Sequence, residues 1–204
     1  MTVSEQGALS WNQQENQLSQ DERLIARCLA GEEVAFSALY DRYATYVYRL
    51  SYGLLQHRED AEEVLQDTFD YAFRKLARYD ADRASFKTWL YQIAVSRARN
   101  KRRRKRAPTF SLSQLVGHDA RAAATDDGSP GPDEALALDD RQKVIWQALS
   151  ELSPKLRETA VLRYYEGLTY PEIGQILDIP AKTAESRMRL AHKALKEMLD
   201  RRQL

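Results

Sequence analysis

The segment from residue 97 to residue 106 is the most densely basic part of this sequence. Every position in it is Lys or Arg except Ala98 and Asn100. Like charges repel one another, and contact with a polyanion relieves that repulsion while releasing counterions. A basic segment at the end of a helix can also be a solvated cap that the helix dipole favours. The density of the charge favours nucleic acid, so the sequence predicts phosphate contacts here.

A second polar group lies near the C-terminus and has helical spacing. Ala184, Met188, Ala191, Leu195 and Met198 share one face, whereas Lys182, Glu185, Ser186, Arg189 and Lys193 share the other. The polar face can donate to phosphates and bond base edges, as a recognition helix in the major groove does. A solvated face on a helical hairpin is the alternative interpretation of the same pattern.

Carboxylates gather in residues 59–70, which contain no Lys or Arg. Asp60, Glu63 and Asp67 lie near one face of the expected helix, so a basic protein partner would be complementary to them. Ordinary solubility is one alternative explanation. Another is a metal site that starts at His57 and Asp60, but the matching Glu and His ligands that a di-metal bundle needs are missing. The sequence therefore predicts no catalytic site.

Helices are expected to position all these groups, because apolar residues recur at intervals of three and four and no segment alternates like a strand. Capping residues and spacing predict helices over residues 19–31, 34–57, 59–76, 85–106, 153–167, 169–177 and 181–199. The first begins with a capping box, Ser19 to Glu22. The last two are separated by Asp178-Ile179-Pro180, which predicts a helix-turn-helix.

Residues 107–132 separate two helical blocks. This segment is rich in Gly, Pro, Ser, Asp and Ala, which neither continue a helix nor build a core. We therefore expect an all-α fold in which two helical domains, residues 19–106 and 133–204, are joined by a flexible linker. The polar residues 1–18 are expected to form a disordered N-terminal extension.

Composition excludes several classes of protein. The chain has 204 residues with 31 Lys and Arg against 30 Asp and Glu, so its average charge is uninformative. No apolar run approaches the roughly 20 residues that cross a bilayer, and no secretion signal is recognisable, so we expect a soluble, cytoplasmic protein. Cys28 is the only cysteine and is expected to be buried and inert, and the three histidines are too dispersed for zinc. No cofactor is expected.

Several motifs together resemble the extracytoplasmic-function (ECF) subfamily of bacterial sigma-70 factors, from about residue 21 to residue 199. Residues 36–43 and 47–50 are similar to the start of the sigma-two domain, and residues 60–69 to its polymerase-binding helix. Residues 86–94 and the basic run resemble the segment that melts and reads the minus-ten element. Residues 152–154, 167–173 and 179–187 resemble the sigma-four domain, which reads the minus-thirty-five element.

The resemblance implies a non-enzymatic subunit that binds promoter DNA and core RNA polymerase, through the beta-prime clamp helices and the beta flap. It also implies that an anti-sigma factor can hold the protein inactive, and that the linker lies in the polymerase cleft near the RNA path. The implied polymerase-binding residues are Asp60, Glu63, Gln66 and Asp67. The implied minus-ten residues are Arg78, Asp80, Ser85, Lys87, Arg97, Asn100, Arg103 and Arg104, and the loop 78–85 would hold a flipped base. The implied minus-thirty-five residues are Lys182, Thr183, Glu185, Ser186, Arg187, Arg189 and Lys193.

Three positions depart from the family's common residues. Ser96 and Asn100 stand where the family commonly has Asn and Asp, and Glu185 stands where it commonly has Lys. These departures affect the expected promoter sequence rather than the class of protein. Two other classes remain as alternatives: a stand-alone helix-turn-helix regulator, and a metal-dependent nucleic-acid enzyme that uses Asp60, Glu63 and Asp67.

Overall fold

A computed structural model describes residues 19–106 and 140–201 of this chain. The predicted N-terminal extension, the linker and the start of the second block lie outside these ranges. Within the described ranges every regular element is helical, which confirms the all-α fold class.

The first group of helices follows the predicted pattern closely. It consists of α2 (Gln20–Leu29), α3 (Glu33–Leu55), α4 (Arg58–Arg74), the short 3-10 helix η1 (Leu76–Arg78) and α5 (Phe86–Arg106). The capping box is present, since the Ser19 amide donates to the Glu22 carboxylate and the Glu22 amide donates to the Ser19 hydroxyl. Ser85 caps α5, because its hydroxyl accepts from the Thr88 amide at 3.2 Å.

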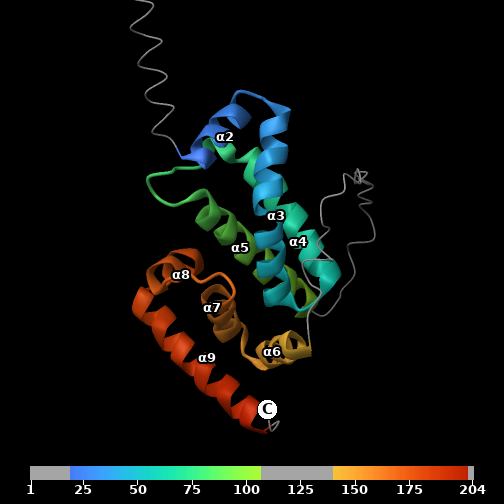
Figure 1. Cartoon of the computed structure of the whole chain (residues 1–204), viewed down its shortest axis with the longest axis vertical. Coiled ribbons are helices and arrows are strands. Elements are labelled where there is room, and N and C mark those ends of the chain that lie inside the picture. The colour runs from blue at the N-terminus through green and yellow to red at the C-terminus, as the bar shows by residue number, and fades with distance from the viewer. Residues whose placement is uncertain (1–18, 107–139, 202–204) are drawn as a thin grey trace, which may run out of the picture.

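The long helix α3 is the centre of this group and packs against α2, α4 and α5 (Figure 1). Its inward positions, such as Leu39, Val47 and Leu50, are fully buried, and each contributes about 1.5–3 kcal/mol of burial. Aromatic residues fill the space between α3 and the start of α5. Phe86 is buried against the Tyr79 and Trp89 rings, so these aromatics belong to the core.

The second group contains α6 (Asp140–Glu151), α7 (Pro154–Tyr164), α8 (Tyr170–Leu177) and α9 (Ala181–Arg201). The helix α9 lies across α7 and α8, and its C-terminal part reaches α6 (Figure 1). A left-handed residue, Asp178 at φ 57°, ends α8 and starts the tight turn into α9. The predicted helix-turn-helix is therefore confirmed.

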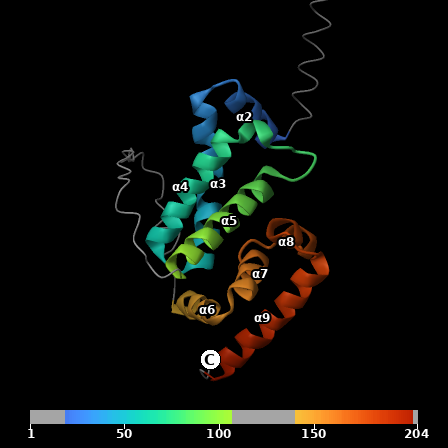
Figure 2. The same cartoon turned by 180° about the vertical axis from the view of Figure 1, so that it is seen from behind.

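The two groups pack against each other, α7 on α3 and α8 on α5 (Figure 2). Gly53 makes the close approach of α3 possible, because a Cβ atom there would lie 2.8 Å from Val161 Cγ1 and 3.0 Å from the Trp146 ring. Trp146 is buried, stacks on Tyr165 and meets Tyr52 edge-on. The buried apolar cluster therefore continues from one group into the other. The sequence pattern gave no indication of this interface.

Candidate nucleic-acid and polymerase interfaces

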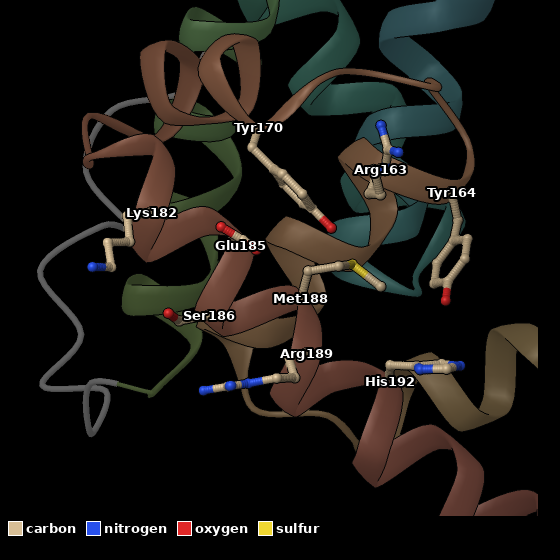
Figure 3. A pocket seen from close by; sticks show the side chains of 9 residues that line it. All are labelled: Arg163, Tyr164, Tyr170, Lys182, Glu185, Ser186, Met188, Arg189 and His192. Atoms are coloured by element: carbon tan, nitrogen blue, oxygen red, sulfur yellow. The ribbon is translucent and has the colours of Figure 1, made fainter.

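The polar face of α9 is exposed, and its opposite face is packed inward, as its pattern predicted. Ala184, Met188 and Ala191 are buried, whereas Lys182, Glu185, Ser186, Arg189 and Lys193 are exposed. Thr183 and Arg187 are half-buried beside them. The exposed face forms one wall of an open groove of about 500 Å³ that Arg163 and Tyr170 border on the other side (Figure 3). Such a surface can contact both phosphates and base edges.

Glu185 lies within that groove beside basic neighbours. Two roles are possible for a carboxylate at this position, an ion pair with Arg189 four residues on or a contact with a base. Within the residues that the structure describes, Glu185 forms no ion pair with Arg189, although both side chains are exposed. Figure 3 shows the Glu185 carboxylate on the Tyr170 side of the groove, away from the Arg189 guanidinium. This arrangement favours the contact with a base.

A more apolar groove of about 620 Å³ lies between α6, α7 and the end of α9. Ile145 is 45% exposed in it, and Leu195 and Leu199 lie along its α9 side. An exposed apolar surface next to polar residues is typical of a site for a protein partner.

The described basic side chains of the run on α5 lie in four different environments. Lys101 and Lys105 pair with carboxylates of α4, whereas Arg99 and Arg102 pair with Glu158 of α7. Arg103 and Arg104 are exposed, and no ion pair is seen for either among the described residues. Arg97 lies over the Tyr71 ring at 4.8 Å, and Asn100 is half-buried. Among the described side chains of this run, Arg103 and Arg104 are therefore the guanidinium groups that are exposed and directly available to a polyanion.

Three implied minus-ten residues are exposed at the end of η1 and in the loop that leads to α5, namely Arg78, Asp80 and Ser85. The loop is held by its own hydrogen bonds, because the Tyr79 hydroxyl donates to the Ala84 carbonyl at 3.0 Å and the Asp82 amide donates to Asp80 at 3.0 Å. An ordered loop with exposed polar side chains suits the predicted contact with an unpaired base.

Lys87 is less accessible than the sequence predicted. Its ammonium group lies 3.3 Å from the Glu166 carboxylate and over the rings of Tyr46 and Tyr91. Tyr91 is fully buried and donates to the same carboxylate. Burial and the nearby Glu166 charge raise the pKa of the Tyr91 hydroxyl, so it remains a donor.

The acidic helix α4 differs from the expectation at one position. Asp60 was expected on an exposed face with Glu63 and Asp67, but its residue surface is only 6% exposed. It lies at the helix start, where Lys105 and Lys101 from α5 reach it. Burial opposes ionisation, but the hydrogen bond from Lys105 and the nearby positive charges hold the pKa of Asp60 below its usual value.

The remaining residues of the predicted polymerase-binding set, Glu63, Gln66 and Asp67, are exposed on α4. Glu63 also pairs with Lys101. The structure gives no support to the metal-site alternative. In residues 19–106 and 140–201, no three His, Cys, Asp or Glu side chains are grouped so that they could hold a metal ion. In the same ranges, no helix has the length and apolarity to span a membrane.

Two buried carboxylates of the second group were not predicted. The side chains of Glu158 and Glu166 are only 2% and 3% exposed, and both bind residues of α5. The position of Glu158 carries no periodic signal, because α7 is buried at five consecutive residues, 158–162, and Glu166 lies beyond the end of that helix. A helix enclosed on several sides does not display an amphipathic pattern.

Comparison with known proteins agrees with this arrangement. The family model for sigma-70 region 2 matches residues 39–107, and the model for sigma-70 region 4 matches residues 142–195. The ECF RNA polymerase sigma factor SigK of Mycobacterium ulcerans is 34% identical, over 87% of this chain and 92% of its own. The RNA polymerase sigma-H factor of Pseudomonas aeruginosa is 30% identical, over 88% and 94%. The fold resembles that of CnrH in its complex with the cytosolic domain of CnrY, with a TM-score of 0.62 at 22% identity over 89% of this chain and 98% of that one.

Proposed function

The chain belongs to the ECF subfamily of the sigma-70 family of RNA polymerase sigma factors, and from this premise we propose how its surfaces divide the work of initiation. A sigma factor binds core RNA polymerase and promoter DNA, and this is the function of the chain. One observation supports the assignment of separate DNA contacts to the two helical groups. The basic end of α5 and the exposed face of α9 lie within the matched region 2 and region 4, respectively.

Two functional domains follow from this proposal. Residues 19–106 bind polymerase and open the minus-ten element, and residues 133–204 read the minus-thirty-five element. The exposed face of α9 enters the major groove, with Lys182 and Arg189 on phosphates and Glu185 and Ser186 near base edges. The loop 78–85 receives an unpaired base, while the exposed arginines of α5 hold the DNA backbone.

Polymerase binding is assigned to two surfaces. Glu63, Gln66 and Asp67 on α4 face the beta-prime clamp helices, and the apolar groove between α6, α7 and α9 accepts the beta flap. The chain itself supplies no catalytic residue, because the polymerase performs RNA synthesis. It works in the cytoplasm, where the bacterial polymerase transcribes.

Run-off transcription tests the function as a whole. Genomic fragments are transcribed by purified core polymerase with and without this chain, and the transcripts are sequenced. Specific start sites that need both components are expected. A stand-alone regulator would instead protect a DNA site without polymerase and would fail to retain core polymerase in a pull-down.

Neutralising the exposed acids of α4 is expected to weaken core binding. Glu63→Gln with Asp67→Asn should lower core affinity by about tenfold, because complementary charge strongly affects association while exposed carboxylates add little stability. Affinity is measured by titrating core polymerase with the labelled chain. Asp70→Asn is the matched control, since Asp70 is exposed on the same helix and pairs with Arg74. Equal affinity for the double variant and the control would contradict the role of α4.

Asp60 requires separate treatment in such experiments. Its carboxylate is buried and paired with two lysines of α5, so its removal would disturb the packing of α4 on α5 as well as any partner contact. A combined variant that includes Asp60 would therefore mix a loss of stability with a loss of binding.

Changing Glu185 is expected to alter which promoters are selected. A carboxylate can accept from the amino group of cytosine, and this contact discriminates by about 1–3 kcal/mol when its geometry is good. Glu185→Lys should raise affinity for arbitrary DNA and shift the preferred bases of the minus-thirty-five element. Glu185→Gln removes the charge without adding a cation. Selection from a randomised promoter library with reconstituted holoenzyme measures both effects, and an identical selected motif for all three proteins would exclude base reading by Glu185.

A further inference from the structure

The contact between α5 and α7 contains an unusual anion site. The Glu158 carboxylate is 2% exposed and accepts from Arg99 Nε at 3.2 Å and from Arg99 Nη2 at 2.8 Å. Arg102 Nη2 donates to the same carboxylate at 3.0 Å. Two guanidinium groups thus enclose one buried anion. A buried carboxylate is tolerated only when it is paired and hydrogen-bonded in this way.

The same pair of arginines is chemically suited to a DNA phosphate. The planar guanidinium fork binds carboxylates and phosphates with the same two-pronged geometry. Arg99 and Arg102 also lie in the basic run whose exposed members, Arg103 and Arg104, are the proposed backbone contacts. We propose that Arg99 and Arg102 form a phosphate-binding site for promoter DNA, and that Glu158 occupies this site when the two helical groups are packed together. This inference rests on the proposed function. It adds that the packing of the two helical groups against each other, here called closure, competes with DNA binding.

Other contacts of the interface involve further parts of the proposed minus-ten surface. Glu166 holds Lys87 and Tyr91 at the start of α5. The Gln175 side chain of α8 donates to the Arg83 carbonyl at 2.6 Å, inside the loop 78–85, and Gln92 donates to the Gln175 carbonyl at 3.0 Å. The packed interface therefore contacts the loop and both ends of α5. While the groups are packed, the donors that Arg99 and Arg102 turn toward Glu158 are not available to a phosphate, although the Arg99 side chain is 40% exposed.

Two substitutions separate the groups in independent ways. Glu158→Gln keeps the shape of the side chain but removes the charge that the arginines bind. Gly53→Ala removes no charge and instead places a Cβ atom 2.8 Å from Val161 Cγ1 at the apolar part of the interface. Alanine is favoured over glycine inside a helix, so α3 itself is not weakened. Glu32→Gln is the charge-matched control, because Glu32 pairs with Arg27 at the corner between α2 and α3.

The experiment uses the full chain without polymerase. Small-angle X-ray scattering measures the radius of gyration, and fluorescence anisotropy measures affinity for a labelled single-stranded oligonucleotide of mixed sequence. Glu158→Gln and Gly53→Ala should each increase the radius of gyration and raise DNA affinity by about fivefold or more. Glu32→Gln should change neither. If both interface variants match the wild type in size and affinity, closure does not compete with DNA and the proposal is overturned.

The phosphate site is tested in a variant whose two helical groups are separated. Arg99→Ala with Arg102→Ala is introduced into the Gly53→Ala variant, or into Glu158→Gln if Gly53→Ala fails to fold. The slope of log affinity against log salt should become shallower by about 1.4, as two lost contacts with single-stranded DNA predict. An unchanged slope would show that the arginines bind only Glu158 and would overturn the proposal. Run-off transcription by wild-type chain and core is measured in parallel, so a failure here is distinguishable from a failure of the proposed function.

Discussion

Arg103→Ala with Arg104→Ala is expected to lower open-complex formation by about tenfold at moderate salt. Both side chains are exposed at the basic end of α5, whereas their neighbours pair with carboxylates of α4 and α7. Each lost phosphate contact removes counterion release, so the salt dependence should flatten by about 0.7–0.9 in slope per contact. The loss should be similar across promoters, because phosphate contacts fix position and affinity without reading sequence.

The measurement is the rate of open-complex formation by reconstituted holoenzyme at several salt concentrations, on promoters of different sequence. Arg23→Ala with Arg27→Ala is a matched control, since it removes two exposed arginines from α2, to which no DNA contact is assigned. A slope identical to that of the wild type would favour the alternative interpretation of the basic run as a solvated helix cap.

The helices could be predicted because their signals are local. The capping box at Ser19, the cap at Ser85 and the spacing of apolar residues in α3 all act within a few residues, and the structure shows each of them. The two faces of α9 could be assigned for the same reason. Its apolar residues meet α7 and α8, and the residues of its polar face are exposed in the part of the chain that the structure describes.

The contact between the two groups could not be predicted, because its signals are distant in sequence. Arg99 and Glu158 are separated by 59 positions, and no periodicity links one to the other. The same holds for Asp60, which is buried because Lys105 of α5 lies over it. Helical periodicity shows which face of one helix is apolar, but it does not show which charged side chain a second helix will cover.

These distant contacts change how the charge pattern of α5 is understood. From the sequence, the basic run is one uniform patch. In the structure, α4 neutralises two lysines and α7 neutralises two arginines, which leaves Arg103 and Arg104 exposed. Because the α4 contacts lie within one group and the α7 contacts lie between groups, separation of the groups would free Arg99 and Arg102 but leave the lysines paired.

Gly174→Ala is expected to abolish reading of the minus-thirty-five element while region 2 stays intact. A Cβ atom at Gly174 would lie 2.7 Å from the Ile179 carbonyl oxygen and 3.3 Å from the Ala181 amide nitrogen. Both are backbone atoms of the turn, so no side chain can rotate away to make room. The turn also depends on the Ile179 amide, which donates to the Gly174 carbonyl at 2.9 Å. Overpacking of this kind costs about 1–3 kcal/mol, which exceeds the gain in helix propensity of about 1 kcal/mol.

Relief of that clash requires α9 to move relative to α8, which displaces the exposed face that carries Lys182, Glu185 and Arg189. The measured quantity is the ratio of transcription from a promoter with an intact minus-thirty-five element to transcription from one with that element scrambled. For Gly174→Ala this ratio should fall to about one, while core binding through α4 is retained. Gly167→Ala is the control, because Gly167 has a φ of 66° with open space around it, so alanine there strains the backbone without pushing on the turn. If Gly174→Ala kept the wild-type ratio, close packing at this turn would not set the position of the recognition helix.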